Sequence, residues 1–93
     1  MTPEQMAAAG ITRRQLELWI TRGWVRPVVH GKGVEREWPA TETHIALLMG
    51  RLVGLATFRP ATAADIARFH VTLGGPVTLA PGLVLHIDEE GRS

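Results

Sequence analysis

The chain has no cysteine and no tyrosine, and only two phenylalanines among its 93 residues. Without cysteine it can form neither disulfides nor thiolate metal sites. Histidine could still bind a metal, but the four histidines are widely spaced and follow no metal-ligand pattern: His30, His44, His70 and His86. We therefore expect neither a metal nor a cofactor.

Motifs of enzyme chemistry and long hydrophobic runs are also missing. The sequence contains no nucleophile motif, phosphate-binding loop or paired-carboxylate site. The most apolar stretch, Ile45 to Phe58, contains Arg51 and is too short to span a bilayer. Arg13 and Arg14 stand where the apolar region of a secretory signal would run. We predict a protein of the cytoplasm that is not an enzyme.

The residues that are present fit one small domain with an uneven charge. Hydrophobic residues make up 45% of the chain, enough for a single core. The net charge is only +1, yet the segment from Thr12 to Arg36 has six basic and two acidic residues. The tail from Val71 has three acidic residues and one basic residue. A basic middle suits a polyanion such as nucleic acid, although an unevenly charged solvated surface would give the same pattern.

Two capping boxes predict two short helices near the N-terminus. Thr2 and Gln5 have the spacing of a reciprocal cap, and Thr12 and Gln15 repeat it. Gly10 separates the two helices, because glycine takes the left-handed conformation that ends a helix at little cost.

The second of these helices carries arginines at its front end. Arg13 and Arg14 fall outside the expected buried stripe and should face outward. The positive end of a helix dipole disfavours cations, so two arginines there suggest that phosphates or guanine edges supply the negative charge. The expected buried stripe consists of Leu16, Trp19 and Ile20.

Residues 28–38 predict a β-hairpin with its turn at Gly31-Lys32-Gly33. Val28, Val34, Arg36 and Trp38 alternate along the two strands. The basic tip resembles a DNA-contacting wing, although such a turn is common in other hairpins.

Residues 2–38 resemble the winged helix-turn-helix of the MerR family of transcription regulators. The resemblance rests on four linked motifs: Gly10-Ile11-Thr12 for a Gly-Val-Ser turn, Leu16-Glu17-Leu18-Trp19 for Leu-Arg-Tyr-Tyr, Gly23-Trp24-Val25-Arg26-Pro27 for Gly-Leu-Leu-x-Pro, and Gly33 to Trp38 for a wing ending in Arg-x-Tyr. It implies a bacterial or phage DNA-binding protein that is mainly α with small β.

The chain also departs from the MerR pattern. Glu17 replaces an arginine that commonly contacts the DNA backbone, and Leu18 replaces an aromatic residue. The long dimerising helix and effector domain of typical members do not fit in the residues that remain. Small excisionase-type proteins share the fold and lack effector domains, so an architectural DNA-binding role is one alternative. A protein-interaction module on the same scaffold is another, favoured by Glu17 and the low net charge.

Two further helices are expected in the second half. The first has a core-facing stripe at helical spacing and either Trp38 or Thr41 as its N-cap. The second begins at a capping box formed by Thr62 and Asp65 and ends near His70. The expected buried residues are Ile45, Leu48, Leu52 and Leu55 in the first helix, and Ile66 and Phe69 in the second.

The tail has the alternation of short strands. Val71-Thr72-Leu73, Val77-Thr78-Leu79 and Leu83 to Ile87 are separated by Gly-Pro turns and predict a hairpin or small meander. We therefore divide the chain into a winged helix-turn-helix domain, 1–70, and a strand-like extension with a frayed acidic end, 71–93. The strands either cover the chain's own core or pair with another subunit or a different partner. A homodimer and a side-by-side oligomer through residues 71–87 both stay open.

The predicted partner is double-stranded DNA. Arginine and glutamine side chains can make bidentate contacts with base edges in the major groove. The predicted recognition residues are Thr12, Arg13, Arg14 and Gln15. The predicted wing and backbone contacts are His30, Lys32 and Arg36, with Arg22 and Arg26 as further phosphate contacts.

Overall fold

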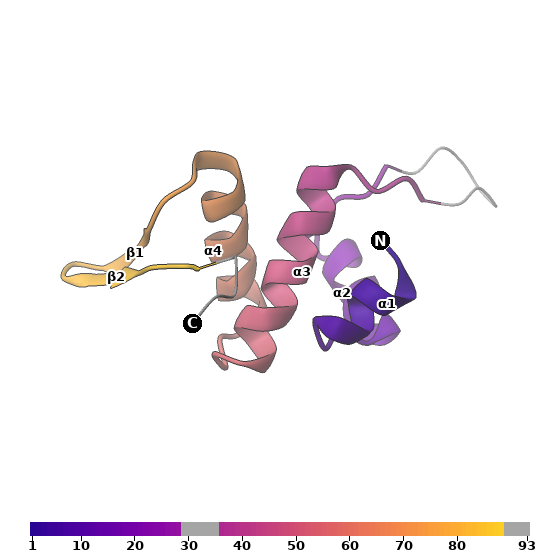
Figure 1. Cartoon of the computed structure of the whole chain (residues 1–93), viewed down its shortest axis with the longest axis horizontal. Helices are drawn as coiled ribbons and strands as arrows, with labels where there is room; N and C mark the ends of the chain where they lie inside the picture. Colours follow the sequence, from indigo (N-terminus) through magenta and orange to yellow (C-terminus); the bar gives the residue numbers. More distant parts are fainter. Residues whose placement is uncertain (29–35, 89–93) are drawn as a thin grey trace.

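A computed structural model describes residues 1–28 and 36–88. Helix α3, Ala40–Gly54, lies in the middle of an elongated molecule of 47 × 24 × 21 Å. The helices α1, Pro3–Ala8, and α2, Arg13–Thr21, lie on one side of α3, and α4, Pro60–Leu73, packs on the other (Figure 1). The strands β1, Val77–Ala80, and β2, Leu83–Leu85, form an antiparallel hairpin beyond α4. The expectation of a mainly helical chain with a small C-terminal hairpin is confirmed.

Both predicted capping boxes are present. The Thr2 hydroxyl accepts the Gln5 backbone N–H, and the Gln5 side chain accepts the Thr2 N–H in return. Thr12 and Gln15 repeat these two bonds at the start of α2, at 3.1 and 2.9 Å. Since α1 and α2 are short, these caps satisfy backbone donors that would otherwise be unpaired.

The core joins α2, α3 and α4. Trp19, Val25, Ile45 and Met49 are almost fully buried, with exposures of 1% or less. Ile11, in the turn between α1 and α2, packs against α3 at Gly50, where a Cβ would come within 2.6 Å of the Ile11 side chain. The missing side chain of Gly50 therefore lets the two elements approach closely.

Several expectations for the second half are wrong. Neither Trp38 nor Thr41 begins α3, because Pro39 is its N-cap residue and no side chain of the described residues caps it. Helix α4 begins two residues before Thr62, which therefore lies inside the helix and cannot act as its N-cap. Proline at the first helical position, Pro60, starts α4 with a backbone angle that already suits the helix.

The segment Val71-Thr72-Leu73, predicted to be a strand, forms the last turn of α4. Its three residues continue the helical hydrogen bonds until Gly74, which has φ 75° and ends the helix. The strand-like part of the tail therefore begins at Val77.

Leu55 and Phe69 were expected in the core but are exposed by 80% and 43%. Leu55 follows the end of α3, where no neighbouring helix covers it, whereas Leu48 and Leu52 earlier in the same stripe are buried.

Candidate nucleic-acid interface

The predicted recognition residues meet at the first turn of α2. Arg13 and Arg14 are the first two residues of the helix, and both are exposed. The first turn contains no acidic residue. Arg14 forms no hydrogen bond or ion pair with any residue in the described part of the chain. The two guanidinium groups are thus available to a ligand in front of the helix.

Thr12 and Gln15 have a structural role at the same place. The Gln15 side-chain oxygen accepts the Thr12 N–H, while the Thr12 hydroxyl accepts the Gln15 N–H. A bidentate contact from Gln15 to adenine would use this same oxygen, so the cap competes with base recognition. The side-chain NH₂ of Gln15 and the hydroxyl hydrogen of Thr12 can still donate.

Arg36 is bound by Glu17, the residue that stands where the MerR pattern has an arginine. Its two terminal nitrogens donate to the two carboxylate oxygens of Glu17, at 2.6 and 2.8 Å. This bidentate contact lowers the pKa of Glu17 and raises that of Arg36, chiefly through the hydrogen bonds themselves. The Arg13 charge lowers the pKa of Glu17 further. Arg36 is therefore positioned on the outer face of α2, but its charge is offset there.

An antiparallel bridge between Val28 and Glu37 brings together the two ends of the predicted wing. Their backbone groups exchange two hydrogen bonds, of 2.8 and 2.9 Å. His30 and Lys32, two of the predicted wing contacts, lie outside the described residues, as does the Gly31-Lys32-Gly33 turn.

The remaining predicted phosphate contacts, Arg22 and Arg26, also interact within the chain. The Arg22 guanidinium lies 5.9 Å from the centroid of the Trp24 ring, within the range of a cation–π contact. Arg26 donates its Nε–H to the Gly23 carbonyl at 3.0 Å. Both side chains are exposed, so their terminal nitrogens are accessible on the surface.

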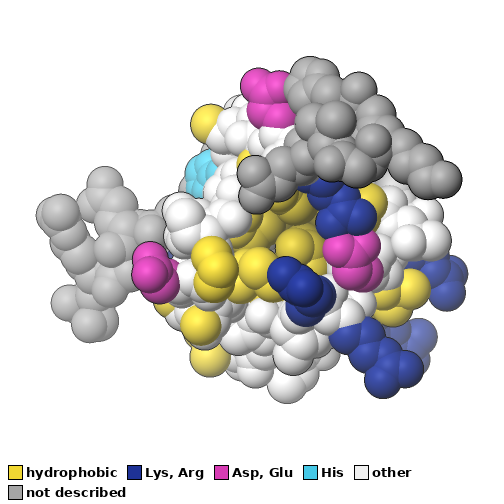
Figure 2. All heavy atoms as spheres, turned by 90° about the vertical axis from the view of Figure 1, so that its right-hand side faces the viewer, with side chains coloured by type: hydrophobic (Ala, Val, Ile, Leu, Met, Phe, Trp, Pro, Cys, Tyr) yellow, Lys and Arg dark blue, Asp and Glu magenta, His cyan; other side chains and the backbone are white. Residues whose placement is uncertain are grey.

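Figure 2 views the molecule from the side of α1 and α2. Basic side chains lie in separate groups over the centre and right of this view, with acidic and apolar side chains between them. Leu18, at the position of the family's aromatic residue, is 47% exposed. The described residues thus form a dispersed set of arginines rather than a continuous basic surface.

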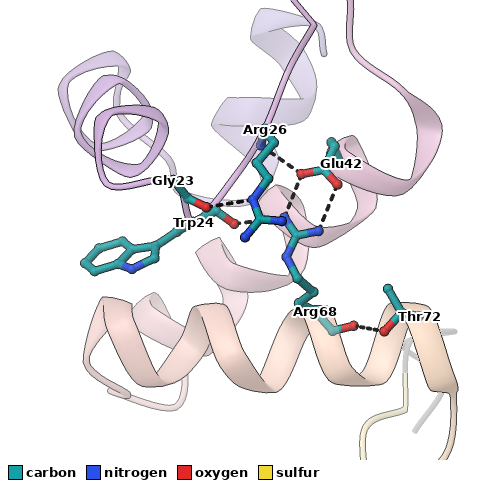
Figure 3. Close-up of polar contacts among 6 residues, drawn as sticks. All are labelled: Gly23, Trp24, Arg26, Glu42, Arg68 and Thr72. Atoms are coloured by element: carbon teal, nitrogen blue, oxygen red, sulfur yellow. Dashed lines mark hydrogen bonds and ion pairs between the residues drawn. The ribbon is translucent and has the colours of Figure 1, made fainter.

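A polar cluster that no sequence pattern predicted joins this face to the rest of the molecule. Glu42, in the first turn of α3, accepts two hydrogen bonds from Arg68 of α4, at 2.7 and 3.0 Å (Figure 3). The same carboxylate accepts the Arg26 backbone N–H at 2.8 Å, and Arg68 also donates to the Trp24 carbonyl. The turn after α2 is therefore tied to both α3 and α4.

The Glu42–Arg68 pair is more enclosed than the Glu17–Arg36 pair. The side chains of Glu42 and Arg68 are 12% and 27% exposed. The hydrogen bonds from Arg68 are the main cause of the lowered pKa of Glu42, and those to Glu42 raise the pKa of Arg68. No local pattern in the sequence indicates such a pair, because 26 residues separate Glu42 and Arg68 along the chain.

Residues 1–28 and 36–88 contain neither a metal site nor a membrane-spanning helix. In this part of the chain, no three acidic or histidine side chains are grouped so as to hold a metal ion. Its helices also lack the combination of length and apolar character that crossing a membrane requires. Comparisons with protein-family models, curated proteins and solved structures found no match for the chain.

Proposed function

We propose that the chain binds double-stranded DNA as a small, MerR-like winged helix-turn-helix transcription regulator, with the first turn of α2 in the major groove. One observation carries this proposal: Arg13 and Arg14 project from a capped helix whose first turn has no acidic residue. Arginine at this place reads guanine edges or binds phosphates, as recognition helices do with their N-terminal residues.

The Val28–Glu37 bridge supports the wing of this proposal. It closes the base of the segment that contains His30 and Lys32 and leaves Arg36 beside α2. In this arrangement the wing residues contact the DNA backbone or minor groove, and Arg22 and Arg26 add phosphate contacts. Glu17 already binds two of the five N–H groups of Arg36, so a phosphate would bind the remaining donors of a guanidinium whose charge is partly offset.

The experiment starts with selection of bound sequences from random DNA, followed by affinity measurements over a range of salt concentrations. With four to six phosphate contacts, log K should fall with log salt at a slope of roughly −4 to −5. We expect Arg14→Ala to relax the sequence preference at one position, at a cost of about 1–3 kcal/mol for the preferred base. We expect Lys32→Ala to weaken binding to all sequences alike.

Arg59→Ala is the matched control. Arg59 is an exposed arginine at the start of α4, so its loss changes the net charge equally without touching the predicted surface. Binding that is insensitive to salt would contradict the proposal. So would equal effects of Arg14→Ala and Arg59→Ala on specific and random DNA.

An architectural role is the second candidate. It is favoured by the hairpin that follows α4, at the place where the MerR resemblance implies a long dimerising helix. Footprinting separates the two roles, because a regulator protects one or two half-sites whereas an architectural factor covers and bends a longer array. A chain that gives no DNA shift even at low salt, but retains a stable protein partner, would instead be an interaction module.

A further inference from the structure

The C-terminal hairpin has an apolar face that α4 covers only at its base. Val77 pairs with Leu85, and Leu83 lies two residues before Leu85, on the same side of β2. Val77 is 7% exposed, whereas Leu83, at the far end of the hairpin, is 61% exposed. Figure 1 shows the hairpin projecting away from α4. The face that packs on the helix thus continues beyond it into solvent.

A groove of about 380 Å³ lies between α4 and β1. Its walls are largely apolar, with Asp65 as the charged residue in the lining. Leu79 in this lining is 43% exposed. The other large apolar side chains of the groove are Ile66, Phe69 and Val77. The groove is therefore suited to an apolar side chain from outside.

We propose that two copies of the chain associate through this surface, with Leu83 of each copy seated in the α4–β1 groove of the other. The arrangement is isologous, because the same tip and the same groove are used twice around a two-fold axis. Residues 71–87 contain no Asp, Glu, Lys or Arg. Two copies can therefore meet without charge repulsion, and the strand edges lack the charges that usually prevent such pairing.

The area available agrees with a modest dimer. Monomers rarely expose contiguous apolar patches beyond a few hundred Å². The exposed parts of four side chains together offer on the order of 400 Å², against the ~800 Å² that each partner buries in a standard interface. These side chains are Phe69, Leu73, Leu79 and Leu83. Backbone and threonine surface around them would supply much of the rest.

This association is independent of the proposed function, because none of its residues belongs to the predicted DNA surface. Under the proposed function, it would supply the dimer that presents two α2 helices to inverted half-sites.

Sedimentation of the chain without DNA tests the proposal. We expect a reversible dimer with a dissociation constant of roughly 1–100 µM. Leu83→Glu should weaken it at least tenfold, because it places a carboxylate in an apolar groove beside Asp65 of the second copy. Leu83→Lys should weaken it less, since its ammonium group would face the same aspartate.

Leu55→Glu is the control, because Leu55 is 80% exposed at the end of α3 and lies outside the surface. It should leave the dimer unchanged. Circular dichroism and the thermal midpoint should match the wild type in all three variants, since both positions are exposed. A monomeric wild type at about 0.5 mM, dissociation by Leu55→Glu, or equal effects of Glu and Lys at position 83 would overturn the proposal. A chain that does not bind DNA but still forms this dimer would contradict the proposed function and leave the proposed association unaffected.

Discussion

Gly50 shows how a single residue sets the distance between α3 and the turn that follows α1. A Cβ at this position would lie 2.6 Å from the Ile11 side chain and 2.7 Å from the Ala9 carbonyl oxygen. We predict that Gly50→Ala destabilises the protein by roughly 1–3 kcal/mol, because the backbone of the turn must move to accept the methyl group. Urea denaturation measures the change.

Gly54→Ala on the same helix is the matched control. In the described structure, a Cβ at Gly54 would meet no atom within 4 Å. Since glycine is a poor helix former, this substitution should raise the free energy of unfolding by up to about 0.5 kcal/mol. Effects of the same sign at both positions would contradict the packing explanation.

Glu17 and Arg36 show at the same scale why the roles of single residues were hard to predict. The sequence marked Glu17 as the loss of a phosphate contact and Arg36 as a wing contact. In the structure the two bind each other at 2.6 Å, although 19 residues separate them. No local spacing rule joins residues this far apart, so the pair could be found only from the folded chain.

At the scale of the element, the matching caps of α1 and α2 allow the effect of a cap on stability to be distinguished from its effect on DNA binding. Thr2 and Thr12 make the same pair of bonds at the starts of α1 and α2. We predict that Thr2→Ala and Thr12→Ala each cost about 1 kcal/mol of stability. Only Thr12→Ala should also weaken DNA binding severalfold, because only α2 carries the predicted base contacts.

Thermal unfolding and DNA titration of the two variants provide the measurements. Equal losses of DNA affinity would mean that binding follows overall stability and that α2 has no special role. An unchanged affinity for Thr12→Ala would instead show that the cap does not orient the first turn of α2.

Elements were predictable where their signals were local. A capping box lies within four residues, and Thr2…Gln5 and Thr12…Gln15 were read correctly from spacing alone. The Val71-Thr72-Leu73 segment was not, because two apolar residues flanking a threonine fit both a strand and the end of a buried helix. Its state depends on α4, whose hydrogen bonds continue to Gly74. Leu55 likewise fits the helical stripe, but the position of neighbouring helices leaves it exposed.

At the scale of the whole molecule, Glu42 and Arg68 connect the predicted DNA-binding side to α4. Their contact joins α3 and α4, and both residues also hold backbone groups of the turn after α2. Removing one partner leaves the other partly buried without its counter-charge. We predict that Glu42→Gln lowers the free energy of unfolding at pH 7 by about 1–3 kcal/mol.

This loss should depend on pH in a defined direction. Arg68 lowers the pKa of Glu42 below its ordinary value of 4.5, so the folded state favours the carboxylate more than the unfolded chain does. The resulting stabilisation is fully present above pH 4.5 and is lost as the pH falls through the lowered pKa. The difference in the free energy of unfolding between the wild type and Glu42→Gln should therefore become smaller in acid.

Urea denaturation at steps from neutral pH to about pH 3 follows this change. Glu17→Gln is the control, because the Glu17–Arg36 side chains are 49% and 37% exposed and their contact should contribute only about 0–1 kcal/mol. If the difference in the free energy of unfolding between the wild type and Glu42→Gln stays constant with pH, then packing rather than charge underlies the contribution of Glu42 to stability. If this difference becomes smaller as the pH falls, the Glu42–Arg68 ion pair is the acid-sensitive connection between the α2 side of the molecule and α4.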